Sequence, residues 1–293
     1  MTSHTVALYL MTSRGLAVLQ GLLDRIGPGA LRCVVSVRDP GTLDDGFDAI
    51  QDMARAAGIP FFERAEAPPD GGHGLLVAWR WLIDPFERVV VLHDSLLPRY
   101  RGFAPLVTSL LNAEPEIGVT AVWAAREFDA GPVIGRRRIA ITYPLTIREA
   151  LARLQPLYQE LAVEIVEAIV AGATLPAQAQ DDRAATYSLW RDEEDYWMDW
   201  TRDAGFLRRF VDALGYPYRG AKSRLNGAVV SVLAVEEVPD VVVEIRQPGK
   251  VLFVRAGCPV VVCGQGLLLI RRLVDRSTGE SRLPLTRFRS RFG

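Results

Sequence analysis

The sequence predicts an α/β protein in which a Rossmann-like domain with a mostly parallel sheet is followed by a small β-barrel of OB-like type. In the first half of the chain, apolar runs of strand length alternate with helix-type patterns, as in strand–helix–strand units. Beyond Gly220, short valine- and leucine-rich runs are separated by turn sequences such as Asn226-Gly227, which is typical of an antiparallel barrel. The chain of 293 residues is long enough for both domains.

Apolar runs bounded by turn residues place the first strands. They are expected over residues 6–11, 33–37, 59–62 and 89–93. Leucines recur at helical spacing after the first strand, so a helix should follow it, with Ser13 as the N-cap. A second helix should run through Ile50 and Met53.

The same patterns place the later elements and the domain boundaries. A helix, two strands and a long helix are expected over residues 104–113, 118–123, 133–141 and 146–170. Pro156 should kink or divide the long helix. Asp199 or Thr201 should cap a further helix. Barrel strands are expected over residues 229–235, 241–245, 251–254, 260–263 and 267–273. Linker composition near residue 178 then gives a first domain over 1–178, a linker over 179–204 and a barrel domain over 205–293.

Composition excludes several classes of protein. The formal net charge of −1 gives no general attraction to nucleic acids or membranes. The chain shows neither a secretory signal nor an apolar run of membrane-spanning length, so a cytoplasmic protein without membrane contact is expected. Cys33, Cys258 and Cys263 lie beside valine-rich segments and should be buried structural thiols. Since the chain has only three histidines and no metal-ligand spacing, no metal site is expected.

Two regions carry a local charge. Residues 39–52 hold five aspartates, which either form a solvated surface or repel phosphates. From Gly249 onward, nine basic residues face two acidic ones, giving a local balance of +7. This basic end either attracts a phosphate-bearing partner or keeps the barrel soluble.

The strand that ends at His93 carries the clearest chemistry. It delivers an imidazole, the acid Asp94 and the hydroxyl of Ser95 to its carboxyl end, and Pro98 then turns the chain. Open α/β sheets bind ligands at such ends. Upstream, Trp79 and Trp81 flank Arg80, either to stack on a planar ligand or to pack in the core. Asp129 precedes Gly131 by two positions and could by itself be an ordinary turn residue.

Four ordered motifs resemble the formyltransferase family that uses 10-formyltetrahydrofolate, which includes methionyl-tRNA formyltransferase and sugar N-formyltransferases. They are His-Asp-Ser-Leu-Leu-Pro-Arg-Tyr-Arg-Gly at 93–102, Ala-Pro at 104–105, Gly-Val-Thr at 118–120 and Asp-Ala-Gly at 129–131. The resemblance continues through Ala-Thr-Tyr-Ser at 185–188 and Tyr-Pro-Tyr-Arg-Gly-Ala at 216–221, so it covers both domains and makes the first one catalytic.

The resemblance implies the reaction and the roles of several residues. A formyl group would pass from 10-formyltetrahydrofolate to an amine, with His93 polarising the formyl group and handling protons and with Asp129 orienting the imidazole. The implied folate-binding residues are Trp81, Leu82, Ile83, Ser95, Leu96, Leu97, Pro98, Glu127 and Phe128. The implied substrate-binding residues are Arg99, Arg101 and Gly102.

One departure from the family pattern concerns the catalytic step itself. The family has an asparagine two positions before the histidine, whose amide donates to the developing oxyanion, and this chain has Val91 there. Loss of one such donor typically costs about 3 to 4 kcal/mol of barrier. Asp94 also stands where the family has a small residue. Either another donor, such as protonated His93 or a backbone amide, serves the oxyanion, or the chemistry has drifted.

Three functions follow as alternatives. The first is N-formylation of a small amine, above all a nucleotide-linked amino sugar. The second is formylation of methionyl-tRNA, which the acidic residues 39–52 disfavour because they would repel a phosphate backbone. The third is a folate-binding relative that lost efficient catalysis through Val91. The acceptor and the oligomeric state, with a homodimer among the alternatives, are not written in the sequence.

Overall fold

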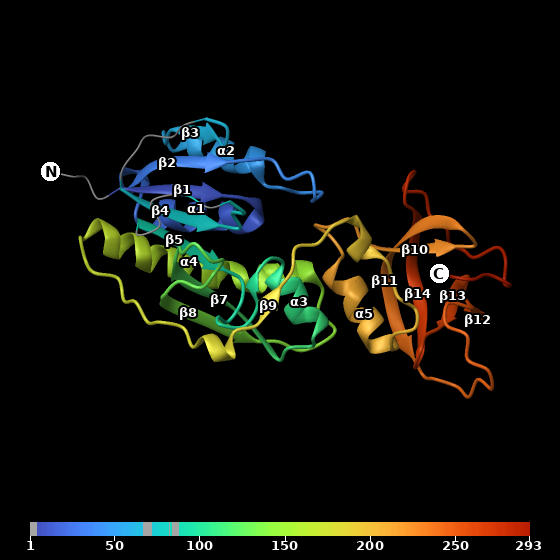
Figure 1. Ribbon diagram of the computed structural model, residues 1–293. Coiled ribbons are helices and arrows are strands. Elements are labelled where there is room, and N and C mark those ends of the chain that lie inside the picture. Colours follow the sequence, from blue (N-terminus) through green and yellow to red (C-terminus); the bar gives the residue numbers. More distant parts are fainter. Residues whose placement is uncertain (1–4, 67–71, 82, 84–87) are drawn as a thin grey trace. The chain divides into compact units, whose positions relative to one another are not determined.

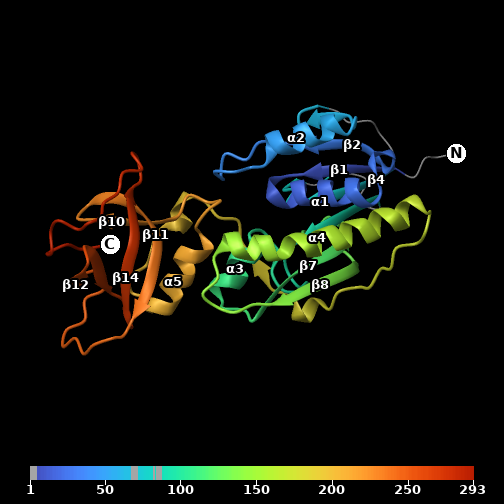
Figure 2. The same cartoon turned by 180° about the vertical axis from the view of Figure 1, so that it is seen from behind.

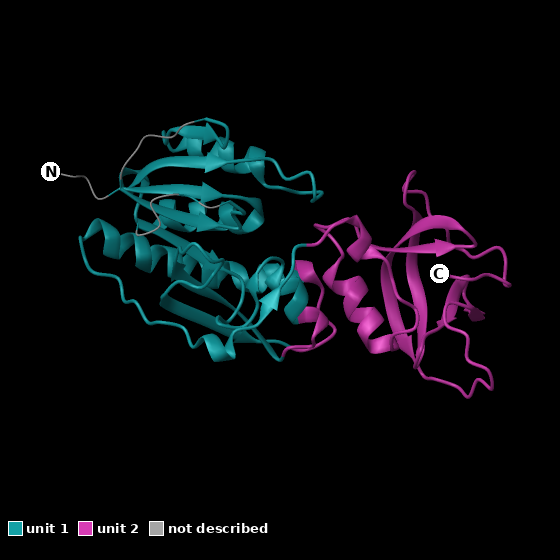
Figure 3. Cartoon of the chain, in the orientation of Figure 1, with its two compact units in different colours: residues 1–109, 115–141, 149–190 teal, residues 110–114, 142–148, 191–293 magenta. Residues whose placement is uncertain are grey.

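The computed structural model describes residues 5–66, 72–81, 83 and 88–293. The chain divides into two compact units (Figure 3). Unit 1 comprises residues 1–109, 115–141 and 149–190, and unit 2 comprises residues 110–114, 142–148 and 191–293. The main division, after Trp190, falls within the predicted linker.

Unit 1 is built on a seven-stranded sheet with the order β3-β2-β1-β4-β5-β7-β8 (Figure 1). The strands are β1 (Val6–Leu10), β2 (Leu31–Ser36), β3 (Phe61–Glu63), β4 (His73–Val77), β5 (Val89–His93), β7 (Glu116–Trp123) and β8 (Val133–Ala140). The first five are parallel, whereas β7 is antiparallel to both β5 and β8, so the predicted mostly parallel sheet is confirmed. The carboxyl ends of β1, β4 and β5 therefore form one edge, where such sheets bind ligands.

Three helices lie side by side along one face of this sheet (Figure 2). They are α1 (Thr12–Arg25), α2 (Phe47–Ala56) and α4 (Ile147–Val170). The Gln159 side chain of α4 donates to the Ala17 carbonyl of α1 at 2.8 Å. The predicted cap of α1 was wrong: the N-cap is Met11 and no side chain caps it, because the helix begins at Thr12. Of the two outcomes predicted for Pro156, division of the helix was wrong, since the residue lies inside the single helix α4.

Unit 2 contains a five-stranded antiparallel sheet with the order β10-β11-β14-β13-β12. The strands are β10 (Ala221–Leu225), β11 (Ala228–Val238), β12 (Val251–Arg255), β13 (Cys258–Val262) and β14 (Leu267–Asp275). Helix α5 (Ala204–Ala213) has Asp203 as its N-cap, so neither Asp199 nor Thr201 caps it as predicted. The expected strand over 241–245 is wrong: the segment forms no strand, and Val242 is 91% exposed.

The last four residues of the chain bridge the two edge strands of this sheet. Arg224 and Gly293 exchange backbone hydrogen bonds of 3.0 and 3.1 Å on the β10 side. On the β12 side, the Val251 amide donates to Ser290 at 3.1 Å and the Phe292 amide donates to Gly249 at 2.7 Å. The chain end thus closes the sheet in the manner of a barrel, as the sequence predicts.

The three cysteines differ in their burial. Cys33 and Cys263 are buried free thiols, whereas Cys258 is only half-buried, so the prediction of three buried thiols was wrong for Cys258. Burial raises the pKa of Cys263 to about 12.

No helix in the described part of the chain is long and apolar enough to cross a membrane.

We expect Phe292 to be a main support of the barrel. Its side chain is 1% exposed and its ring lies 5.4 Å from that of Trp200. Phe292→Ala should lower the free energy of unfolding by about 3 to 5 kcal/mol. Phe288→Ala is the control, because that ring is 56% exposed, and it should cost less than about 1 kcal/mol. Urea unfolding measures both, and equal costs would contradict the closure.

Candidate active site

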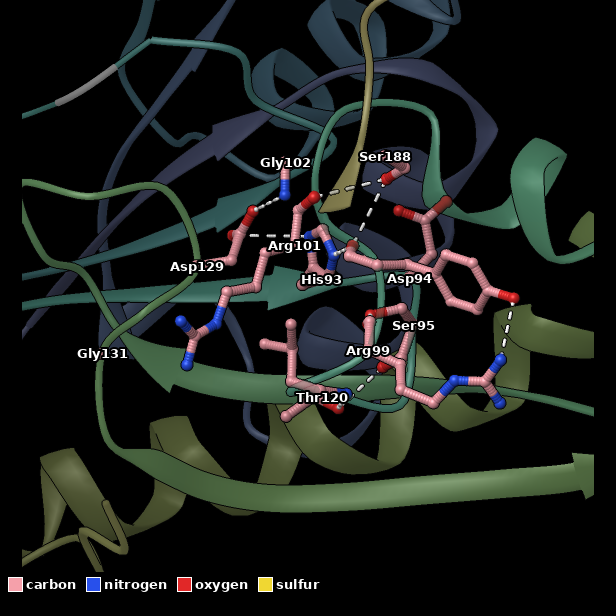
Figure 4. A network of polar contacts seen from close by, with 12 residues as sticks. His93, Asp94, Ser95, Arg99, Arg101, Gly102, Thr120, Asp129, Gly131 and Ser188 are labelled. Carbon is pink, nitrogen blue, oxygen red and sulfur yellow. Dashed lines mark hydrogen bonds and ion pairs between the residues drawn. The ribbon is translucent and has the colours of Figure 1, made fainter. Parts of the chain in front are cut away.

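His93, the last residue of β5, is held between two acceptors (Figure 4). Its side chain is 6% exposed, Nε2 lies 2.8 Å from the Tyr100 carbonyl oxygen, and Nδ1 lies 3.4 Å from Oδ1 of Asp129. The Nε2 contact is a hydrogen bond, whereas the Nδ1 contact is an ion-pair distance that counts only when the ring is protonated. The ring thus has a backbone carbonyl at one nitrogen and a carboxylate beside the other.

Asp129 reaches His93 from a loop that begins at the other end of the sheet. Because β7 is antiparallel to β5, the 124–132 loop starts beside Val89, whose carbonyl accepts from the Ala124 amide at 2.8 Å. His93 lies four residues further along β5, about 13 Å at 3.3 Å per residue. The loop must therefore fold back over the sheet to bring the carboxylate to the imidazole. The resemblance to the family implied that the two residues meet, but the sequence did not reveal the route of the loop.

The Asp129 carboxylate has a second partner in Gly102. Its Oδ2 accepts from the Gly102 amide at 2.9 Å, and its side chain is 11% exposed. Gly102 has a φ of 97°, and a Cβ on it would lie 2.7 Å from the carbonyl oxygen of Ser188. Only glycine fits this position, so the amide that orients the carboxylate depends on it.

Part of the predicted linker belongs to this site. Strand β9 (Tyr187–Ser188) pairs in parallel with β6 (Arg101–Gly102). The Thr186 hydroxyl accepts from the Tyr100 amide at 2.9 Å, and its carbonyl accepts from the Arg101 amide at 2.8 Å. Sequence reasoning missed Thr186, Ser188 and Gln180 as site residues, although the Ala-Thr-Tyr-Ser motif pointed to two of them. This segment supports the backbone from which the His93 acceptor Tyr100 projects.

The predicted wall of the site is a turn held by its own hydrogen bonds. The Ser95 hydroxyl donates to the Arg99 carbonyl at 2.7 Å, and the side chain is buried. Thr120 of β7 donates its hydroxyl to the Ser95 carbonyl at 2.7 Å and accepts from the Leu97 amide at 3.2 Å. The peptide bond before Pro98 is cis. Ser95 is thus placed as a structural hydroxyl in the turn, beside Leu96 and Pro98.

The predicted substrate-binding arginines differ in their surroundings. Arg99 is exposed, and its guanidinium lies 5.0 Å from the ring centroid of Tyr100. Arg101 is 2% exposed, and its guanidinium donates to Gln180 and to Asp182 within unit 1. The charge of Arg101 is thus satisfied inside the protein, and its predicted contact with a substrate stays a prediction.

The predicted folate-binding residues outside the turn are placed as follows. The ring of Trp81 lies under the Arg64 guanidinium, 4.1 Å from it, and Ile83 is half-buried. Glu127 is exposed, and the 46% exposed Phe128 lies 5.1 Å from the ring of Phe103. Leu82 lies outside the described residues. The folate contacts of this set stay a prediction.

Trp79 and Arg80 resolve the alternative that the sequence left open. Trp79 packs edge-on against Tyr9, with ring centroids 5.3 Å apart, and joins a buried cluster that includes Val35. Arg80 forms an ion pair with Asp39, which is buried. Trp79 therefore packs in the core. The structure does not show Arg80 between two tryptophans that stack on a ligand.

Val91 fills its position with apolar contacts. Its half-buried side chain packs against the buried cluster of Leu97, Val122 and Val133. No hydrogen-bond donor can come from this side chain. This side chain could therefore not stabilise an oxyanion at this strand end.

Asp94, the second departure, has a partner that the sequence did not reveal. Its carboxylate forms an ion pair with Arg14 in the first turn of α1, and the two side chains are 12% and 14% exposed. Tyr158 of α4 lies close to this pair, and its burial together with the charge of Asp94 raises its pKa well above the usual value. The only signal for this ion pair in the sequence was Asp94 itself, because a carboxylate that is removed from water needs a cation beside it.

Comparison with known proteins identifies the family of the chain. A formyl transferase family model matches residues 72–166, and a model of the formyl transferase C-terminal domain matches residues 191–283. The chain is 32% identical over 271 residues to methionyl-tRNA formyltransferase of Roseiflexus sp., covering 89% of this chain and 76% of that protein. The chain belongs to the formyltransferase family.

Two further relatives differ in their names. Methionyl-tRNA formyltransferase of Dechloromonas aromatica is 28% identical over 290 residues, which cover 97% of this chain and 87% of that protein. An N-formyltransferase from Helicobacter canadensis, solved with folinic acid and dTDP-3-aminofucose, has a TM-score of 0.69 at 15% identity over 91% of this chain and 98% of that one. The similarity to the Helicobacter canadensis protein shows only that the two proteins share a fold. In the described part of this formyltransferase, no group of three or more His, Cys, Asp or Glu side chains is placed to hold a metal ion.

We expect Val91→Asn to lower stability without raising the rate of formyl transfer. The new amide would enter an apolar cluster, and an unsatisfied buried polar group costs about 1 to 3 kcal/mol. Val91→Ala is the control for lost packing alone. Urea unfolding and initial rates of the three proteins test this, and a gain in rate of about tenfold or more would show that the natural site merely lacks the amide.

Proposed function

We propose that the protein transfers a formyl group from 10-formyltetrahydrofolate to the amine of a small acceptor, with a nucleotide-linked amino sugar as the first acceptor class. The observation that carries the proposal is the His93–Asp129 pair at the carboxyl end of β5, in a chain of the formyltransferase family. The Helicobacter canadensis relative, solved with folinic acid and an amino sugar nucleotide, supports both the donor and the acceptor class.

The pair suits the chemistry of formyl transfer. The acceptor nitrogen forms a bond to the formyl carbon, the bond from that carbon to N10 of the folate breaks, and the proton lost by the amine returns to N10. A base must take this proton and an acid must return it, which a histidine beside a carboxylate can do. The negative charge that develops on the formyl oxygen needs a cation or donor, and with Val91 in place the His93 imidazolium is the group we assign to it.

The charge near the site favours a small amine over a polyanion. Residues 38–48 contain four aspartates and one arginine. This segment is tied to the start of α1 by a 2.8 Å hydrogen bond from the Thr12 amide to the Asp45 carbonyl. The four aspartates outnumber Arg38 and Arg80, which pair with Asp48 and Asp39, so the formal charge of the segment is negative. A negative charge attracts an ammonium group and repels a long phosphate backbone more than the short phosphate group of a nucleotide.

Methionyl-tRNA is the second candidate acceptor, and two observations favour it. The sequence relatives named above are methionyl-tRNA formyltransferases. In unit 2, the arginines at 287, 289 and 291 are exposed, and no carboxylate of the described residues forms an ion pair with them. Exposed, uncompensated arginines are what a nucleic acid backbone requires.

Substitution of the pair tests the reaction. His93→Ala and Asp129→Asn should each lower formyl transfer by at least about 10²-fold, because each removes part of the proton transfer and charge stabilisation. Asp129→Asn keeps an oxygen for the Gly102 amide, so folding should persist by circular dichroism. Asp52→Asn is the control, since Asp52 is exposed, and it should match the wild type. Wild-type rates in either site variant would sink the assignment.

An acceptor panel decides between the candidates. The protein is incubated with 10-formyltetrahydrofolate and nucleotide-linked amino sugars, amino acids or charged initiator tRNA, and products are weighed by mass spectrometry. A mass gain of one formyl group on a small amine supports the proposal. A gain on the tRNA alone would replace it with the second candidate. Folate binding without any transfer would instead show the impaired, folate-binding relative that Val91 allows.

A further inference from the structure

We propose that Gln180 is a positioning residue for catalysis, whose side-chain amide holds the Asp129 loop against His93. The inference rests on the proposed function, since it assigns to Gln180 the placement of the carboxylate used in formyl transfer. Gln180 lies 51 positions from Asp129, in the segment after α4. It is half-buried within unit 1.

The amide nitrogen of Gln180 holds the loop at two points. Its Nε2 donates to the carbonyl oxygens of Asp129 and Gly131, both at 2.7 Å. These carbonyls lie on either side of Ala130, so the two hydrogen bonds fix the turn that carries the carboxylate. Asp129 has a φ of 56°, in the left-handed region that non-glycine residues rarely adopt. Such a conformation persists only where its surroundings impose it.

The amide oxygen of Gln180 holds the other segment that contacts the carboxylate. It accepts from Nε and Nη2 of Arg101 at 3.1 and 3.0 Å, and Nη2 also donates to Asp182 at 2.8 Å. Arg101 directly precedes Gly102, whose amide donates to Asp129. The two donors and two acceptor positions of the amide are all used, which fixes its orientation, because a flipped amide would face its NH2 group toward the guanidinium.

The route of the loop makes this support necessary. The 124–132 loop leaves β7 at the end of the sheet remote from His93, so no strand end places Asp129. Its position instead depends on side-chain hydrogen bonds, and Gln180 supplies two of them. A displacement of about 1 Å in a catalytic group can cost on the order of 10² in rate.

Gln180→Glu removes the hydrogen bonds that the Gln180 side chain donates and keeps those that it accepts. The carboxylate can still accept from Arg101, but it cannot donate to the carbonyls of Asp129 and Gly131. We expect kcat to fall by about 10²-fold, with the KM for 10-formyltetrahydrofolate and the melting temperature close to wild type.

Gln178→Ala is the matched control. Gln178 is an exposed glutamine in the same segment, and its backbone exchanges hydrogen bonds of 2.7 and 2.9 Å with Val133, which the substitution keeps. This variant should show the wild-type kcat and KM. Gln180→Asn, with a shorter side chain that still carries an amide, should recover part of the loss seen in Gln180→Glu.

A double-mutant cycle shows whether Gln180 acts through Asp129. In an Asp129→Asn background, Gln180→Glu should cost no further rate. A wild-type kcat in Gln180→Glu, or an undiminished loss in the Asp129→Asn background, would overturn the proposal. If the wild-type protein transfers no formyl group, the proposed function fails. The loop assignment is then decided by the backbone amide NMR signals of residues 129–131, which should shift in Gln180→Glu and stay in place in Gln178→Ala; unchanged signals in Gln180→Glu would refute it.

Discussion

The contact between His93 Nδ1 and Asp129 Oδ1, 3.4 Å long, is the interaction around which the candidate site of unit 1 is arranged. Strand β5 fixes one partner by its register, since His93 pairs with Thr120 of β7. The other partner is brought back over the sheet by a loop with no strand to place it. The Gly102 amide, the Gln180 side chain and the buried Arg101 guanidinium all serve to hold that carboxylate where the imidazole needs it.

The sequence predicted the sheet and the two central residues because those features are local. Strand β5 is a continuous apolar run, and His93 and Asp129 lie in motifs that resemble the family. Gln180 and Arg14 were not found, because their roles depend on side-chain bonds to residues 51 and 80 positions away. Strand β10 was missed because it carries Lys222, Ser223 and Arg224, and residues 241–245 were misjudged because valines there are exposed.

Val91 and Asp94 change the electrostatics of the strand end together. The asparagine amide of the family is replaced by an apolar contact with Leu97, Val122 and Val133, so the oxyanion loses a neutral donor. Asp94 adds a negative charge immediately after His93, and Arg14 neutralises it within a largely buried ion pair. The Arg14–Asp94 ion pair thus lies next to the imidazole that contacts Asp129. In the mechanism we propose, the positive charge of His93 takes over the role of the missing amide.

The most direct test of the His93–Asp129 pair is a double-mutant cycle on the rate of formyl transfer. If Asp129 acts through the imidazole of His93, Asp129→Asn lowers the rate in the wild-type protein and costs little further rate in a His93→Ala background. An equal loss in both backgrounds would contradict the account.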